Sequence, residues 1–152
     1  MKKYLFFVLI AISTTISAQT WQVLNSGVPA TLKVSALCFT GDSQFDIGYA
    51  VGGQYYQTGF VIKTTDGGDT WSAQTVLTND YATGVSFPTS QVGFVCAQNG
   101  KIFKTTDGGT SWTRAPGLLP VAVDDIRIQM PTGDVVLGTY GRGIVVGEGS
   151  DE

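Results

Sequence analysis

An eight-residue motif that occurs twice constrains this chain more than any other feature. Thr64–Trp71 reads Thr-Thr-Asp-Gly-Gly-Asp-Thr-Trp, and Thr105–Trp112, 41 residues later, reads Thr-Thr-Asp-Gly-Gly-Thr-Ser-Trp. The similarity extends upstream, where Gly48–Val51 matches Gly93–Cys96. A period of roughly 20 to 50 residues is the signature of repeat architectures, in which each repeat forms one supersecondary unit.

A third copy follows at the same offset. Gly84–Phe87 aligns with Asp125–Ile128, and Phe94–Cys96 aligns with Val135–Leu137, without a gap as far as Val146. The match ends there, before a third motif is complete. The chain therefore divides into repeats at about 30–74, 75–115 and 116–152.

The first repeat is nine residues longer than the second, because Trp21 and Trp71 are 50 residues apart. Four of the extra residues lie around Gly53–Gln57, between two predicted strands. We expect them to lengthen a hairpin loop, which is where binding surfaces vary most readily.

The pattern within each repeat predicts strands. Apolar runs of four to six residues, rich in Val, Ile, Phe and Tyr, alternate with turns that contain Gly, Asn or Asp, and no segment sustains a helical period. We expect an all-β domain over 19–152, made of about three four-stranded antiparallel blades of a partial β-propeller.

The repeated motif resembles the Asp-box, or BNR repeat, and matches it at every fixed position. Its physical logic is a tight turn between two strands: the Asp carboxylate accepts backbone N–H groups, the glycines allow positive φ, and the Trp ring packs against neighbouring strands. The residues at the fixed positions are Thr64, Asp66, Gly68, Thr70 and Trp71, and then Thr105, Asp107, Gly109, Ser111 and Trp112.

An alternative interpretation makes Asp66, Asp69 and Asp107 catalytic carboxylates or calcium ligands. A calcium loop of the EF-hand kind needs oxygen ligands at alternating positions and a distal Glu, which neither copy supplies. We therefore favour a structural role for these aspartates.

Asp-box families include sialidases, sortilin-type receptors, certain glucanases and propellers related to photosystem II assembly factors. The chain looks most like the last group and its secreted bacterial relatives, because an Ile/Val-x-Lys-Thr-Thr-Asp-Gly-Gly segment follows a Gly-aromatic strand. Leu137–Ile144 also resembles the closing strand of sortilin-like propellers. The resemblance implies a fold, and it leaves the function open because one fold hosts many activities.

The first 18 residues resemble a secretory signal peptide. A basic start, Met1–Lys3, precedes the apolar run Tyr4–Ile12 and the small residues Ser17 and Ala18. Nine apolar residues are too few for a membrane-spanning helix, which needs about 20. We expect a protein exported to the periplasm, cell surface or exterior, with no membrane insertion after the signal is removed.

The net charge limits the classes of partner that the chain can bind. Without Lys2 and Lys3 the chain carries seven basic and twelve acidic residues, a net charge of −5, which argues against nucleic acid and anionic membranes. We expect a protein or glycan partner.

Cys38 and Cys96 fall on strands of different repeats, so two separate buried thiols are favoured over one disulfide.

Catalysis is disfavoured. The sequence has no His, which removes His-based triads and the commonest metal ligand, and we expect no metal or cofactor. The alternative is a partial or degenerate glycoside hydrolase of the sialidase or glucanase kind. A sialidase needs an arginine cluster and a nucleophilic tyrosine, for which the chain offers Arg114, Arg127, Arg142 and Tyr140. Asp124 and Asp125 are adjacent, and we interpret them as solvated loop acids with opposite orientations.

For a binding role the candidates are Tyr55, Tyr56, Tyr140 and Arg142, because exposed Tyr and Arg anchor interfaces. The alternative is that the tyrosine pair packs over a blade edge. Three blades are fewer than the about four to eight that close a ring. We therefore consider that copies of the chain self-associate, or that the chain is a shortened propeller. An N-terminal strand at Trp21–Leu24 would complete the final blade, within one chain or between chains.

Overall fold

The computed structural model describes residues 33–40, 46–54, 57–78, 80–115, 121–129 and 132–147, without the side chains of 75, 76 and 78. The predicted signal peptide, the predicted strand at Trp21–Leu24 and the pair Tyr55 and Tyr56 lie outside these residues. In the described part, no helix has the length and apolar character needed to cross a membrane.

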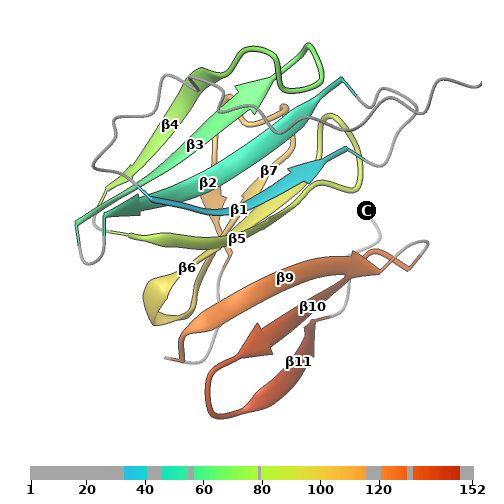
Figure 1. Ribbon diagram of the computed structural model, residues 1–152. Coiled ribbons are helices and arrows are strands. Elements are labelled where there is room, and N and C mark those ends of the chain that lie inside the picture. Colours follow the sequence, from blue (N-terminus) through green and yellow to red (C-terminus); the bar gives the residue numbers. More distant parts are fainter. Residues whose placement is uncertain are drawn as a thin grey trace, which may run out of the picture.

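Three antiparallel sheets make up the structure, as the sequence pattern predicted (Figure 1). Each sheet keeps its strands in chain order, so every connection is a hairpin. Blade 1 contains β1 (Lys33–Phe39), β2 (Gly48–Gln54), β3 (Thr58–Thr64) and β4 (Ser72–Thr78). Blade 2 contains β5 (Ala82–Ser86), β6 (Gly93–Ala97), the 3₁₀ turn η1 (Gln98–Gly100), β7 (Lys101–Thr105) and β8 (Thr113–Arg114). Blade 3 contains β9 (Val123–Gln129), β10 (Asp134–Thr139) and β11 (Gly143–Gly147).

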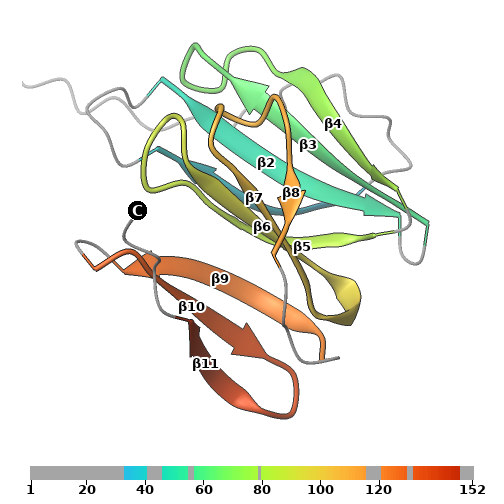
Figure 2. The same cartoon turned by 180° about the vertical axis from the view of Figure 1, so that it is seen from behind.

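The blades are stacked through their first strands. β5 packs against β1 and β2 of blade 1, and β9 packs in the same way against β5 and β6 of blade 2. Figures 1 and 2 show β1, β5 and β9 succeeding one another along one side of the molecule, with the later strands of each blade behind them. Each blade therefore has a front face, turned towards the preceding blade, and a rear face, turned towards the next one.

Apolar side chains fill both inter-blade spaces. Between blades 1 and 2 the buried residues include Tyr49, Val51, Val61, Val85, Phe87 and Val95. Between blades 2 and 3 they are Cys96, Ile102, Val123, Ile126 and Leu137. A third, smaller cluster of Ala50, Phe60 and Ile62, with Trp71 packed against it, lies on the front face of blade 1. Most of the described core therefore lies between blades.

One aromatic contact ties the first two blades together. The ring of Tyr49 on β2 stacks on Phe87, which follows β5, with centroids 3.5 Å apart and planes 2° from parallel. The Tyr49 hydroxyl donates to the Gly108 carbonyl oxygen at 2.9 Å, which places a buried hydrogen bond between the blades. Trp112 meets Phe87 edge-on, with centroids 6.0 Å apart.

The expected loop insertion in the first repeat is wrong in detail. β2 and β3 each have seven residues, whereas β6 and β7 each have five, and three residues connect the two strands in both blades. The four extra residues therefore lengthen the paired strands of the hairpin rather than its loop. The physical reason is that Gly53↔Gly59 and Gln54↔Thr58 continue the antiparallel pairing.

The gapless alignment of the third repeat is also wrong by one residue after β9. Val85 pairs with Val95 in blade 2, and its counterpart Ile126 pairs with Leu137 rather than Val136. One additional residue therefore lies between β9 and β10. The shift keeps a large apolar residue on the buried face, because Leu137 is 2% exposed.

Both cysteines are free thiols in different blades, which confirms the favoured interpretation. Cys38 lies on β1 and Cys96 on β6. Burial raises the pKa of both thiols to about 11, so neither carries the thiolate needed for reactivity near neutral pH.

We predict that Tyr49→Phe lowers the free energy of unfolding by about 1 kcal/mol, because it removes one buried hydrogen bond and keeps the ring stack. Urea denaturation followed by fluorescence measures the change. Tyr140→Phe is the matched control, since Tyr140 is 79% exposed and its variant should unfold like the wild type. Equal effects of the two substitutions would contradict the role given to the Tyr49 hydroxyl.

Candidate functional site

The first Asp-box forms a closed set of hydrogen bonds between β3 and β4. The Asp66 carboxylate accepts from the Thr70 backbone N–H at 2.9 Å and from the hydroxyls of Thr70 and Thr64 at 2.5 and 2.7 Å. The Gly68 N–H donates to the Thr64 hydroxyl oxygen at 2.9 Å, and the Trp71 ring N–H donates to the Gly68 carbonyl at 3.0 Å.

The second Asp-box repeats this network between β7 and β8. The Asp107 carboxylate accepts from the backbone N–H and hydroxyl of Ser111 at 2.9 and 2.6 Å and from the Thr105 hydroxyl at 2.7 Å. The Trp112 ring N–H donates to the Gly109 carbonyl at 3.1 Å. Gly109 has a φ of 88°, a conformation that strains any residue with a Cβ, which confirms the predicted role of the glycines.

The hydrogen bonds leave both aspartates firmly ionised. The hydroxyl of Thr70 is the main cause that lowers the pKa of Asp66 to about 2, and Ser111 does the same for Asp107. A carboxylate whose oxygens are occupied by its own turn has little capacity to act as a general acid or to bind a metal. In the described part of the chain, no three His, Cys, Asp or Glu side chains form a metal-binding group.

A pocket of about 590 Å³ lies at the opposite end of the blades from the Asp-boxes. It lies where β1, β5 and β9 begin and where the hairpins β2–β3, β6–β7 and β10–β11 turn. Each blade contributes three residues: Lys33, Gly53 and Gln54 from blade 1; Tyr81, Thr83 and Gln98 from blade 2; Ala122, Asp124 and Tyr140 from blade 3.

The inner strands and the turns before them fix the orientation of the pocket hydroxyls. The Thr83 hydroxyl donates to the Val123 carbonyl at 2.5 Å and thereby links β5 to β9. The Ser35 hydroxyl donates to the Tyr81 hydroxyl oxygen at 2.6 Å and links blades 1 and 2. The pocket walls are therefore held by bonds that cross from one blade to the next.

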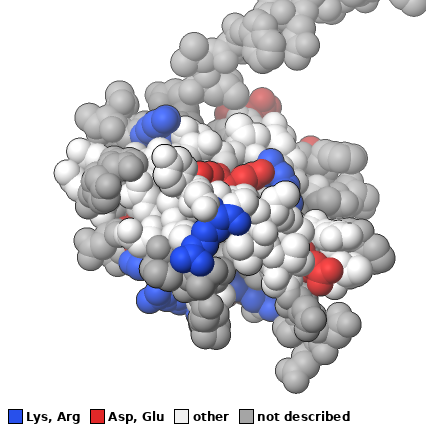
Figure 3. Space-filling model, turned by 90° about the horizontal axis from the view of Figure 1, so that it is seen from below, with Lys and Arg blue, Asp and Glu red and all other residues white. Residues whose placement is uncertain are grey.

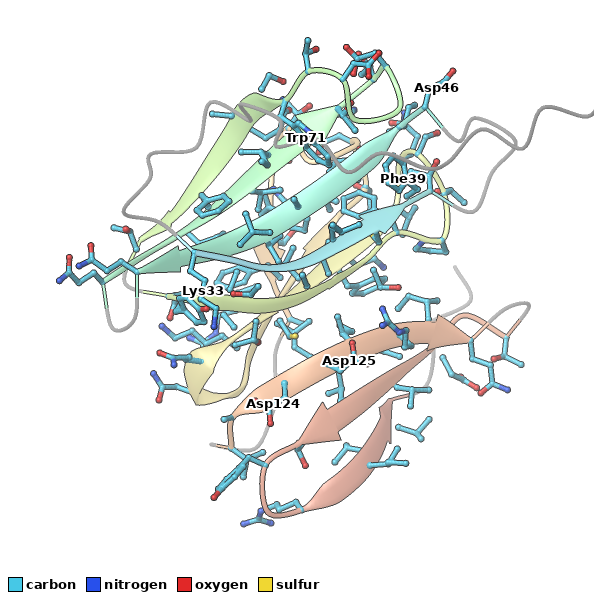
Figure 4. All side chains as sticks on the ribbon, viewed as in Figure 1. Lys33, Phe39, Asp46, Trp71, Asp124 and Asp125 are labelled. Atoms are coloured by element: carbon cyan, nitrogen blue, oxygen red, sulfur yellow. The ribbon has the colours of Figure 1, made fainter. Side chains whose placement is uncertain are left out.

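The pocket combines one cation and one anion with neutral polar groups. Lys33 at the start of β1 and Asp124 on β9 lie on the same side of the molecule, with β5 between their strands (Figure 4). Gln54 and Gln98 add amide donors and acceptors. Such a lining suits a ligand with alternating donors and acceptors, such as a polypeptide backbone.

The four predicted binding residues have different outcomes. Tyr140 lines the pocket and is well exposed, so its ring is available to a ligand. Arg142 is exposed in the turn between β10 and β11, and it is not among the residues that line the pocket. Tyr55 and Tyr56 lie outside the described residues, next in sequence to Gln54, which lines the pocket.

The interpretation of Asp124 and Asp125 as solvated acids agrees with their exposure, and their expected place in a loop is wrong. Both lie on β9, and the pairing passes from Gly138↔Asp125 to Thr139↔Val123, which makes Asp124 a β-bulge. A bulge interrupts the alternation of side chains, and both carboxylates are exposed between two buried residues. Asp125 pairs with Arg127 at 3.5 Å.

The arginines of the sialidase alternative are dispersed. Arg114 lies on the outer strand β8, Arg127 on the inner strand β9 and Arg142 in a hairpin turn. None of the described residues that line the pocket is an arginine. On the face shown in Figure 3, acidic and basic side chains are interspersed, so this face carries no continuous basic stripe.

The sequence signal for most of the pocket residues was missed. Thr83 and Asp124 occupy the same place in successive repeats, near the start of the inner strand, and Gln54 and Gln98 both lie at the turn of the second hairpin. Thr83 and Asp124 differ in type, and strand pairing aligns Gln98 with Gly53 rather than with Gln54, so self-similarity does not highlight these residues. Variable residues at constant repeat positions would have been the signal.

We predict that the Asp66 carboxylate stabilises the fold in a pH-dependent way. Its folded-state pKa of about 2 lies below the usual 3.8, so the stabilisation is fully present above pH 4 or so and is lost as the pH falls through about 2. Asp66→Asn should therefore lower the Tm at neutral pH, and the difference from wild type should shrink across that window. Asp69→Asn, in the same turn, is the control. An Asp66→Asn effect that is the same at every pH would contradict this account.

Comparisons with known proteins place the chain. The family model described as photosynthesis system II assembly factor YCF48 matches residues 13–129. No curated protein matches the chain. Among solved structures, YCF48 bound to a D1 peptide is similar with a TM-score of 0.64 and 24% identity, over 79% of this chain and 39% of that chain. YCF48 from Cyanidioschyzon merolae gives 0.63 and 24%, over 80% and 36%.

An ancestral GH74 enzyme is also similar, with a TM-score of 0.57 and 15% identity, over 77% of this chain and 17% of that chain. These structural likenesses establish the propeller fold. The chain spans about two fifths of the first of these structures. Because the family model covers well over half of the sequence, the chain belongs to the family of the photosynthesis system II assembly factor YCF48.

Proposed function

We propose that this chain is a noncatalytic binding module that holds an extended protein segment in the pocket where its three blades meet. The observation that carries the proposal is the composition of the pocket wall. Each blade contributes three residues, and together they present hydroxyls, amides, one cation and one anion in about 590 Å³. Pockets with a few convergent polar groups are the preferred ligand sites of proteins.

The comparisons support a protein ligand over a glycan. One of the similar structures is YCF48 bound to a D1 peptide, which is a protein segment held by a propeller of this family. The pocket also suits a peptide, because Gln54, Gln98 and Thr83 offer donors and acceptors to a backbone, and Tyr140 offers an exposed ring to a side chain.

The proposed role involves no bond making. The ionised Asp66 and Asp107 are engaged by their own turns, away from the pocket. Asp124 is the one acid among the described residues that line the pocket, so the lining offers no second carboxylate. A paired-carboxylate hydrolase needs two acids on either side of the bond that it cleaves.

Two further parts of the proposal concern location and assembly. The basic and apolar start of the sequence supports export to the periplasm, cell surface or exterior. We also propose that copies of the chain associate with one another, because the three blades of the described residues are fewer than a closed ring needs.

The proposal predicts that filling the pocket abolishes peptide binding. Peptides selected on the wild-type protein from a phage-displayed random library are labelled, and their binding is measured by fluorescence anisotropy. Ala122→Arg places a long side chain in the pocket and should weaken binding at least tenfold. Thr113→Arg adds the same charge on the exposed strand β8 and should leave binding unchanged.

The melting temperatures of both variants are measured beside the binding curves. Selected peptides that bind Ala122→Arg as tightly as the wild type, with the variant folded, would refute the pocket as the binding site. Hydrolysis of the bound peptide would refute the noncatalytic role.

A further inference from the structure

The exposed large apolar side chains of the described residues gather on the two end blades. They are Val34, Leu37 and Phe39 on β1, and Tyr140, Ile144 and Val146 on or beside β11. Blade 2, which has a neighbour on each face, contributes none to this set. The apolar exposure therefore marks the two faces that no described blade covers.

The front face of blade 1 repeats the front face of blade 2. Leu37 pairs with Ala50 as Val85 pairs with Val95, and Phe39 packs its ring on Gly48 as Phe87 does on Gly93. Val85 and Phe87 are 1% and 3% exposed, because blade 1 covers them. Leu37 and Phe39 occupy the same places in the repeat and are 58% and 38% exposed.

The rear face of blade 3 repeats the rear face of blade 2. Ile144 pairs with Gly138 as Ile102 pairs with Cys96, and the neighbouring pair Val136↔Val146 lies on the same face. Ile102 is 3% exposed because blade 3 covers it, whereas Ile144 is 75% exposed. One end of the array thus has an unpaired front face, and the other end has an unpaired rear face.

We propose that a second copy of this chain covers both faces, in a head-to-tail dimer. The front face of blade 1 in each copy packs on the rear face of blade 3 in the other. A contact between two different faces closes into a ring when the rotation permits. Two copies bring six of the described blades, within the about four to eight of known propellers. This deepens the self-association proposed above by naming its surfaces.

The strands available for this contact are those used inside the chain. Blade 2 docks on blade 1 chiefly through its inner strand β5, and blade 3 docks on blade 2 chiefly through β9. In blade 1 the front-face residues Ala50, Phe60 and Ile62 are already buried, while the inner strand β1 remains exposed. A contact made by β1 with β9 and β10 of the second copy therefore repeats the internal arrangement.

The charges on the rear face of blade 3 do not oppose the contact. Asp125 and Arg127 lie there and pair with each other at 3.5 Å, while Asp134 lies on the same face at the outer start of β10. The face therefore carries no net charge from this pair. Ionised residues at the rim of an apolar contact are common in protein interfaces.

The experiment measures the mass of the full chain by sedimentation equilibrium over a range of concentrations. The wild type should reach the mass of two chains. Leu37→Lys and Ile144→Lys each place a charge in both contacts of the ring and should give the mass of one chain. Thr113→Lys, on the exposed strand β8, is the control and should keep the mass of two.

Mixing the two variants separates head-to-tail packing from the alternatives. The Leu37→Lys copy keeps an intact rear face and the Ile144→Lys copy keeps an intact front face, so the mixture should regain part of the dimer. A front-to-front dimer would be lost in Leu37→Lys alone and unaffected by Ile144→Lys, which would overturn the proposal. Circular dichroism checks the fold of each variant, and Leu37→Ser replaces Leu37→Lys where the latter does not fold.

A wild-type mass of one chain at every concentration would also overturn the dimer. If such a monomer still binds the selected peptides in the pocket, the proposed function stands without the inferred assembly. If the dimer forms and the pocket variant Ala122→Arg binds as well as the wild type, the reverse holds.

Discussion

The structure depends on the packing of each inner strand against the first two strands of the preceding blade. A four-stranded sheet with apolar residues on both faces cannot bury them by itself, so each blade is stable only as a neighbour of another. The contact of Tyr49 with Phe87 shows how specific this packing is. The stacked rings, the edge-on Trp112 and the hydrogen bond to Gly108 fix the distance between two blades at one point. Because burial needs a neighbouring blade, Val85 in blade 2 is buried while Leu37, at the same repeat position in blade 1, is exposed.

The two ends of the blades differ in structure: the Asp-box turns lie at one end and the pocket lies at the other. At one end the Asp-box turn satisfies its own polar groups and anchors the loop beside it, as the Gly108 N–H does by donating to the Gln91 carbonyl at 2.9 Å. That end is therefore constrained and nearly identical in two repeats. At the other end the hairpin turns and the starts of the inner strands share no turn motif, and single contacts such as Thr83 to Val123 hold them. Their side chains can differ between repeats, and this is the end that holds the pocket.

The difference between the two ends explains what the sequence could predict. The Asp-box residues had to satisfy a turn geometry, so their types and spacing revealed the strands on either side and the 41-residue period, from which the third blade followed. The pocket residues Lys33, Tyr81 and Ala122 share a repeat position and no residue type, so no repeat pattern pointed to them together. The misplaced insertion and the one-residue shift before β10 have another cause. The sequence does not distinguish a residue added to paired strands from one added to a turn. In blade 1 the pairs Gly53↔Gly59 and Gln54↔Thr58 extend the strands, and in blade 3 the burial of Leu137 sets the register.

Binding and assembly would be coupled in such an array. Each blade adds residues to the pocket wall from the start of its inner strand and from the turn of its second hairpin. A second copy placed beside blade 3 would therefore bring its own Lys33 and Gln54 next to the pocket residues of blade 3. A protein segment long enough to contact both copies would bind the assembled form more tightly than the single chain. By thermodynamic linkage the segment would then stabilise the assembly by the same factor. In such a repeat array the ligand and the partner copy each favour the binding of the other, and the binding surface is complete when both are present.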